Sequence, residues 1–116
     1  MTAPNIVNVS TITGKTDQIA LSSTSATVLL SNAASSGKVV KVNTIIVANV
    51  DATNACDVTV DLHSAAAGGG TAFSIVSTAS VAADSSLVAL DKSTAIYLEE
   101  DMSITVTAGT ANDLEV

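Results

Sequence analysis

Hydrophobic and polar residues alternate with a period of two along most of this chain. In the segment 56–63 the even positions are apolar and the odd positions are polar, and the segment 102–108 repeats this arrangement. Because successive side chains of a strand point to opposite faces of a sheet, each segment is predicted to be a strand with one buried and one solvent-exposed face. The outward residues of the second strand would be Ser103, Thr105 and Thr107.

The segment 38–50 is apolar at both parities. Two interpretations are open for it. It is either a central strand that is buried on both faces, or a longer strand that is bent by a bulge near Asn43.

No segment carries the apolar face of a helix, and clusters of turn-forming residues recur about every 8 to 15 residues. This spacing is typical of sandwiches and barrels, so we predict an all-β fold. We expect an antiparallel β-sandwich of the jelly-roll or immunoglobulin-like type with about eight strands. The predicted strands are 5–12, 17–22, 26–31, 38–50, 56–63, 72–80, 86–91 and 102–108, with shorter additions at 95–98 and 112–116.

A length of 116 residues fits one domain, which we place at residues 1–116. Residues 1–10 are interpreted as an extended N-terminal arm, because Pro4 disfavours regular strand pairing. The run of three alanines and three glycines at 65–70 is predicted to be a flexible hairpin tip. The last alternation stops at an apolar residue, and we expect that residues completing this strand are missing from the sequence.

The composition of the chain argues against several classes of function. Aromatic residues make up 2% of the chain, so the core must consist of aliphatic side chains, and such a thin core favours oligomerisation or docking onto a larger body. The net charge is −7 and the basic residues are four lysines with no arginine, which argues against nucleic-acid binding. No apolar run approaches the roughly 18 residues of a membrane span.

Cys56 and His63 are the residues that most resemble a nucleophile and its base. They are an odd number of positions apart on one predicted strand, which places them on opposite faces and about 23 Å apart. We therefore expect Cys56 to be a small buried hydrophobic residue and His63 to face solvent. Gly14-Lys15-Thr16 looks like the end of a phosphate-binding loop, but position 9 is Val where that loop needs Gly.

Carboxylates gather at 99–101, where Glu99, Glu100 and Asp101 are consecutive. Two interpretations are open, a Ca²⁺ site and a solvated acidic turn. The run lacks the alternating carboxylates and the glycine of a calcium loop, which favours the solvated turn and no metal ligands. Asp57 and Asp61 would lie about 13 Å apart, too far to share one metal ion.

The chain has one Phe and one Tyr. Phe73 falls inside a predicted strand and is expected in the core. Tyr97 is then the only ring available to stack on a sugar, which weakens the case for a carbohydrate-binding module.

Several stretches form a pattern of their own: a Lys-Val-x-x-Ile-x-x-x-Asn strand, the sequence DVTVDL, a Gly-rich tip, the connector LVALDKSTAIYLEE and a closing S-x-T-x-x-A-x-x-A-N-D-L strand. They lie at residues 41–49, 57–62, 68–70, 87–100 and 103–114. Over residues 38–116 the chain resembles small structural proteins of tailed bacteriophages, especially marine phages that infect cyanobacteria and other ocean bacteria. The N-terminal third is similar only loosely. Those relatives continue past the final alternation with a few strand residues and an acidic tail, which this sequence lacks.

The resemblance implies a virion structural protein, with a capsid decoration protein that cements the head shell as the first expectation. A tail, neck or fibre component is the alternative, and a carbohydrate or cell-surface binding module is a weaker one. It implies no enzymatic activity, no cofactor, and neither nucleic acid nor membrane as a partner. The expected partners are the major capsid protein or other virion proteins and further copies of the chain, in a trimer. The chain would be made in the host cytoplasm and incorporated into the virion.

Overall fold

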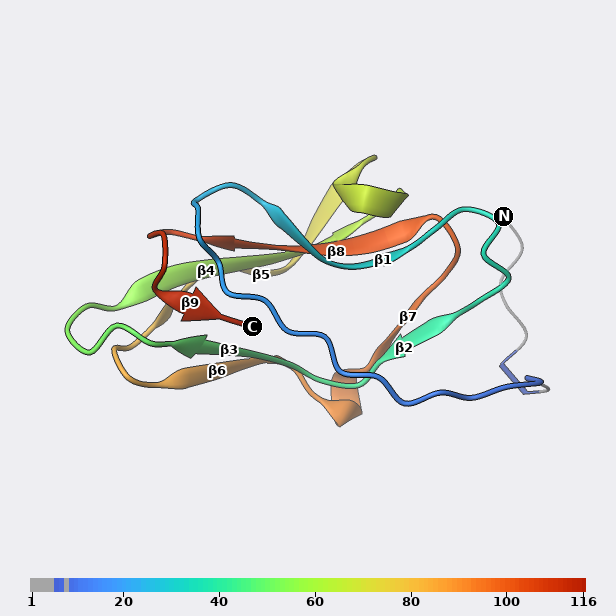
Figure 1. Ribbon diagram of the computed structural model, residues 1–116, viewed down its shortest axis with the longest axis horizontal. Helices are drawn as coiled ribbons and strands as arrows, with labels where there is room; N and C mark the ends of the chain where they lie inside the picture. Colours follow the sequence, from blue (N-terminus) through green and yellow to red (C-terminus); the bar gives the residue numbers. More distant parts are fainter. Residues whose placement is uncertain (1–5, 8) are drawn as a thin grey trace.

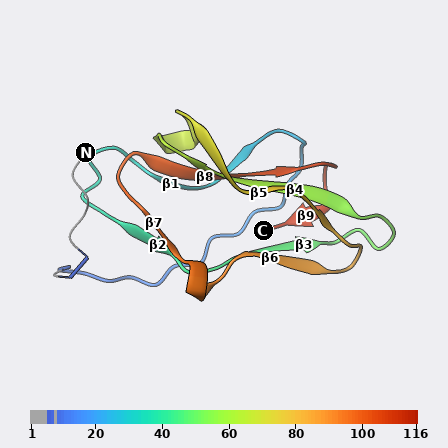
Figure 2. The ribbon, with the colours of Figure 1, turned by 180° about the vertical axis from the view of Figure 1, so that it is seen from behind.

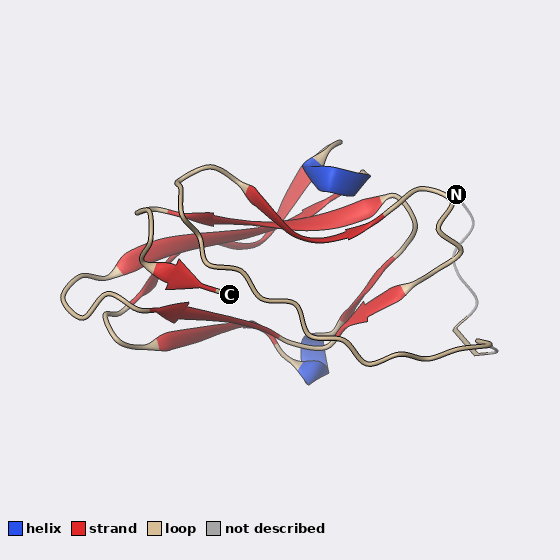
Figure 3. Ribbon diagram, in the orientation of Figure 1, coloured by secondary structure: helices blue, strands red, loops and turns tan. Residues whose placement is uncertain are grey.

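The computed structural model describes residues 6–7 and 9–116, which form nine strands and two short 3₁₀ helices (Figures 1 and 3). All strand pairs found there are antiparallel, so the prediction of an all-β antiparallel fold is confirmed. The elements are β1 (Thr27–Asn32), β2 (Val40–Val42), β3 (Ile45–Asn49), β4 (Cys56–His63), η1 (Ala66–Gly68), β5 (Ala72–Val81), β6 (Ser86–Leu90), η2 (Lys92–Thr94), β7 (Ile96–Leu98), β8 (Met102–Ala108) and β9 (Leu114–Glu115).

The strands form three sheets. The largest has the order β1-β8-β4-β5, the second has the order β6-β3-β9, and β2 pairs with β7 alone. Figure 1 shows the four-stranded sheet on one side of the molecule and the three-stranded sheet on the opposite side, with the β2–β7 pair slanting between them at one end. The core therefore lies between two layers.

The core is built from aliphatic side chains, as the composition predicts. Val58 and Val60 of β4, Val106 of β8, Val47 of β3 and Leu98 of β7 are fully buried. No aromatic ring belongs to the buried core of the described residues. In β4 and β8 the buried positions are on the apolar parity, so alternation selects the face that packs inward.

The segment 38–50 is bent. The chain leaves the β2–β7 pair at Asn43 and Thr44 and joins β6 and β9 as β3. The predicted strand 38–50 is thus two strands, and the break between them lies near Asn43, where a bulge was one of the two interpretations. The interpretation as a strand buried on both faces is wrong, because Ile46 is 49% exposed. Apolar residues occupy both parities because the chain changes sheets.

The two predicted N-terminal strands are largely wrong. The described residues of 5–12 form no strand, and within 17–22 only Ala20 forms an isolated bridge, with Glu115. Residues 1–5 and 8, which include part of the predicted arm, lie outside the described residues. High β-propensity alone does not make a regular strand, because β-propensity depends on the surrounding structure.

The predicted strand 112–116 forms the two-residue strand β9, which has a hydrogen-bonded segment on each side. One side pairs with β3, and the other side bonds residues 19–21, with Ile19 N–H donating to Val116 O at 2.8 Å and Val116 N–H donating back at 2.9 Å. Residues 19–21 thus extend the three-stranded sheet by one more extended segment.

Two buried asparagines connect the sheets. Asn32, at the end of β1, donates through Nδ2 to the carbonyl of Leu98 in β7 at 3.1 Å. Asn49, at the end of β3, donates to the carbonyl of Val81 in β5 at 2.9 Å. Each amide donates to a carbonyl of another sheet, so the sheets are joined by hydrogen bonds as well as by apolar packing.

Candidate functional site

Cys56 and His63 lie at opposite ends of β4. Cys56 is buried in the core, as predicted, with its Sγ 3.6 Å from the carbonyl of Asp57. An eight-residue strand separates the two side chains by about 23 Å, so they do not form a nucleophile and base pair.

The prediction that His63 faces solvent is wrong. His63 is 9% exposed, and both ring nitrogens have partners: Nδ1 lies 3.2 Å from the carbonyl of Gly69, and Nε2 lies 2.8 Å from Thr105 Oγ1. A carbonyl only accepts, so Nδ1 donates to Gly69, and Nε2 shares the second hydrogen bond with the hydroxyl of Thr105. His63 is on the polar parity as expected, but the loop after β4 covers that face.

The loop 65–70 is the tip of the β4–β5 hairpin, as predicted, and hydrogen bonds hold it against the outer face of the four-stranded sheet. Three successive N–H groups donate to side chains of that sheet and its turns. The pairs are Ala66 to Asp101 Oδ1 (3.1 Å), Ala67 to Ser31 Oγ (3.0 Å) and Gly68 to Ser103 Oγ (2.8 Å). The hydroxyl of Ser103 in turn donates to the carbonyl of Ala65 at 2.7 Å. Ser103 and Thr105, predicted to be solvent-exposed, are buried beneath this loop.

Glycine is required at one position of this loop. Gly70 has a φ of +66°, and a Cβ there would lie 2.4 Å from Ser64 Oγ. That hydroxyl accepts from the N–H of Thr71 at 2.8 Å. Any side chain at position 70 would displace the atom that closes the loop.

Asp101 of the acidic turn 99–101 helps to hold the loop 65–70 in place. Asp101 has a φ of +60°, its N–H donates to the carbonyl of Asn32 at 2.8 Å, and its carboxylate accepts from Ala66. A shallow hollow of about 390 Å³ lies beside it, lined by Ser64, Glu99, Glu100, Asp101 and Met102. No group of three or more His, Cys, Asp or Glu side chains that would hold a metal ion occurs within residues 6–7 and 9–116. The structure gives Asp101 a role in fixing the loop.

Phe73 is not a core residue, contrary to the sequence-based expectation. It is 60% exposed and lies near the start of β5, an edge strand with a neighbour on one side only. Tyr97 is also exposed, and Lys41 Nζ lies 6.0 Å from its ring centroid. The two rings belong to different sheets, β5 and β7, and do not share a strand pair.

On the outer side of the three-stranded sheet, the largest apolar side chains belong to β3 and β6. Ile46 and Val88 are cross-strand partners, 49% and 54% exposed, and Val50 is exposed beyond them. Ala48 completes this surface, which we call the β3–β6 face. The signal was present in the sequence as apolar residues at even positions from 46 to 50, but the bend at 43–44 obscured which parity faces inward.

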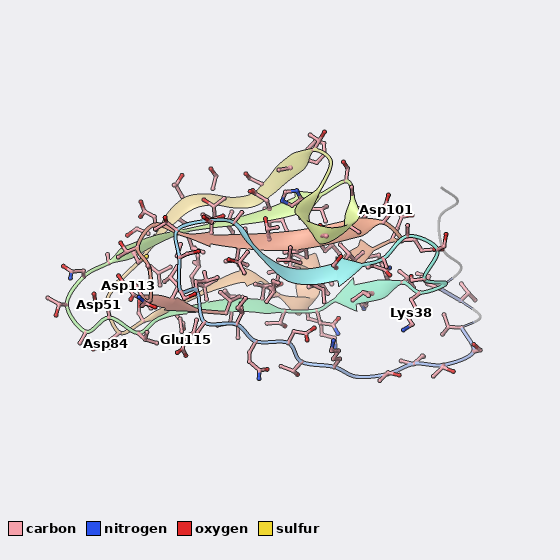
Figure 4. All side chains as sticks on the ribbon, turned by 45° about the horizontal axis from the view of Figure 1, so that its top comes forward. Lys38, Asp51, Asp84, Asp101, Asp113 and Glu115 are labelled. Atoms are coloured by element: carbon pink, nitrogen blue, oxygen red, sulfur yellow. The ribbon has the colours of Figure 1, made fainter. Side chains whose placement is uncertain are left out.

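A hollow of about 450 Å³ borders the β3–β6 face, lined by Gln18, Ile19, Ala20, Ile46, Ala48, Glu115 and Val116. Glu115 is the only carboxylate among these residues. Asp51, Asp84 and Asp113 lie together toward one end of the molecule and Asp101 lies toward the other (Figure 4). The β3–β6 face is thus apolar, open and largely uncharged, which suits contact with another protein surface.

In the part of the chain that the structure describes, no helix is long and apolar enough to cross a membrane. No protein-family model matches the chain, and no curated protein and no solved structure is significantly similar to it.

Proposed function

We propose that the chain is a structural protein of a tailed-phage virion, a capsid decoration protein that stabilises the head shell by protein–protein contacts. We also propose that its two layers form a β-sandwich of the jelly-roll or immunoglobulin-like type. The observation that carries the functional proposal is the β3–β6 face, where Ile46 and Val88 present about half of their surface to solvent on a rigid sheet. Exposed apolar patches of this kind mark protein contact sites.

The small area of the β3–β6 face favours many contacts within a repetitive shell over a stable complex of two free proteins. A stable interface buries about 800 Å² on each partner, and the few apolar side chains of the β3–β6 face supply only part of that area. Many weak contacts held in one lattice act together through avidity. A trimer of this chain on the major capsid protein would multiply each contact in this way.

The net charge of −7 supports a position on the capsid exterior. A strongly acidic protein is repelled by the packaged genome, and its carboxylates do not bind phosphate. The chain would be made in the host cytoplasm and join the virion during assembly, with neither nucleic acid nor membrane as a partner.

Copy number tests the proposal. Quantitative mass spectrometry of purified virions should find hundreds of copies of the chain, in a fixed ratio to the major capsid protein. A total of about three to twelve copies would instead indicate the alternative, a tail, neck or fibre component. Absence from the virion would contradict both.

A further inference from the structure

Register shifts occur at three of the edge strands, β1, β5 and β6, whereas the pairings of β2 with β7 and of β3 with β9 have none. The central pair β4–β8 is matched one to one from Val58 with Ala108 to His63 with Ser103, with no irregularity. Register shifts occur where an edge strand meets its neighbour, in β1–β8, β4–β5 and β3–β6. In each case the additional residue belongs to the edge strand: Leu29 in β1, Ile75 and one residue of the Ser77–Thr78 pair in β5, and Ala89 in β6.

The three edge strands share a second property. Their sequences are TVLLSN, AFSIVSTASV and SLVAL, with no charged residue and no proline. An edge strand presents unpaired N–H and C=O groups to which another chain can add, and lysine, proline and bulges are the usual means of preventing this. Of these three means, these strands contain only the bulges.

β5 is the longest of the three and the most open to pairing. Figure 2 views the molecule from the side on which β5 and β6 lie. β5 has ten residues and its partner β4 has eight, so β5 has two residues in excess. One excess residue is Ile75, between the pairs that Ser74 and Val76 form, and the other is in the Ser77–Thr78 step opposite Thr59.

The Ser77–Thr78 bulge is held in a costly conformation. Thr78 is β-branched and has a φ of +45°, a region that such residues rarely adopt. Its N–H donates to the side chain of Thr59 at 3.1 Å. Strain of this kind persists only where the surrounding structure imposes it.

We propose that the bulges in β1, β5 and β6 protect the edges of the sheets, and that they keep copies of this chain from joining edge to edge. A bulge bends and twists its strand, so the free N–H and C=O groups no longer form a straight row that a second β5 can match. The bulges thereby prevent edge-to-edge pairing of these uncharged strands, a role that a lysine has on the edge strands of other proteins. This inference does not depend on the proposed function.

Deletion of Ile75 and Thr78 tests the proposal. The remaining eight residues of β5 would match β4 one to one, with every cross-strand pair that exists now retained. We expect this variant to form larger species than the wild-type chain at equal concentration in sedimentation velocity, with an association constant about tenfold or more above wild type. A folded variant that sediments like wild type would overturn the proposal.

Two controls sharpen the result. Thr78→Gly relieves the strain but keeps the bulge, so it should sediment like wild type. Adding Ser77→Lys to the deletion variant places a charge on the straightened edge and should reverse the association. If the double deletion does not fold, deletion of Thr78 alone takes its place with the same expected increase. If neither deletion folds, the bulges are needed for β4–β5 pairing itself, and the proposal fails.

Discussion

Thr78 is the residue with the clearest local conflict between sequence and conformation. Its φ of +45° costs a β-branched residue about 1–2 kcal/mol, whereas glycine in a strand loses about 0.5–1 kcal/mol through chain entropy. The side chain is exposed, so little packing would be lost. We therefore expect Thr78→Gly to raise the free energy of unfolding by about 0.5–1 kcal/mol in urea denaturation. Ser80→Gly, in the same strand without positive φ, should lower it, and equal effects of both changes would contradict this account.

Asp91 caps the short helix η2 through its carboxylate. Hydrogen bonds from the side chain and backbone of Ser93, with a further one from Thr94, hold the pKa of Asp91 below its usual value. A folded-state pKa below the unfolded one contributes stability that is present above the unfolded value of 3.8 and is lost as the pH falls through the folded value. The difference in melting temperature between wild type and Asp91→Ala should be constant from about pH 5 to 7 and shrink below about pH 4.

Thermal melts monitored by circular dichroism across this pH range would check the prediction. Asp84→Ala is a suitable control, since Asp84 is an exposed turn aspartate with no cap of this kind. A difference for Asp91→Ala that grows toward low pH would show that the sign is wrong.

Single residues were also where prediction from sequence failed. His63 lies on the strand and parity that alternation assigns, and Phe73 lies on its predicted strand. Alternation states which face a side chain is on, but it does not state what covers that face. The outer side at His63 is covered by a loop with no apolar residue larger than alanine, and the edge position of Phe73 follows from strand order, which a single sequence does not encode.

At the scale of elements, strands that carry a clean period of two were predictable. β4 and β8 lie at the predicted residues because each is a long central strand with neighbours on both sides. The predicted strands at 5–12 and 17–22 have the composition of strands, but their described residues form no regular strand, and only Ala20 forms a bridge. The docking of the loop 65–70 was not predictable, because serine hydroxyls and Asp101 from distant segments hold it.

The link that Asn49 makes between β3 and β5 supports a prediction at this scale. Asn49→Ala leaves the carbonyls of Val81 and Asn54 and the N–H of Asp51 without their partner. A buried group left unsatisfied costs about 1–3 kcal/mol, so we expect a loss of about 2–4 kcal/mol in the free energy of unfolding. Chemical denaturation measures it directly. Asn54→Ala, at an exposed position of the same turn, should change stability by less than about 0.5 kcal/mol.

At the scale of the whole molecule, the β3–β6 face is the surface on which the proposed function depends. Replacing Ile46 and Val88 together by lysine should reduce binding to capsid shells about tenfold or more, because both apolar contacts are lost and two charges are desolvated. Stability should change little, since both side chains already face solvent. Co-sedimentation of the purified chain with shells that lack it gives the measurement.

Val28→Lys is the matched control, since Val28 is an exposed apolar residue of β1 in the opposite layer. Its binding should stay at the wild-type level. If the control weakens binding and the Ile46 and Val88 variant does not, the contact surface lies on the four-stranded sheet and the assignment of the β3–β6 face is wrong.

The antiparallel pairing of β1 with β8 brings together segments from near the two ends of the sequence. During translation, β1 leaves the ribosome long before β8 is made, whereas the β4–β5 hairpin can form at once from local sequence. The nascent chain thus exposes an uncharged strand until β8 has been made, and contacts between residues this far apart in sequence form slowly during folding.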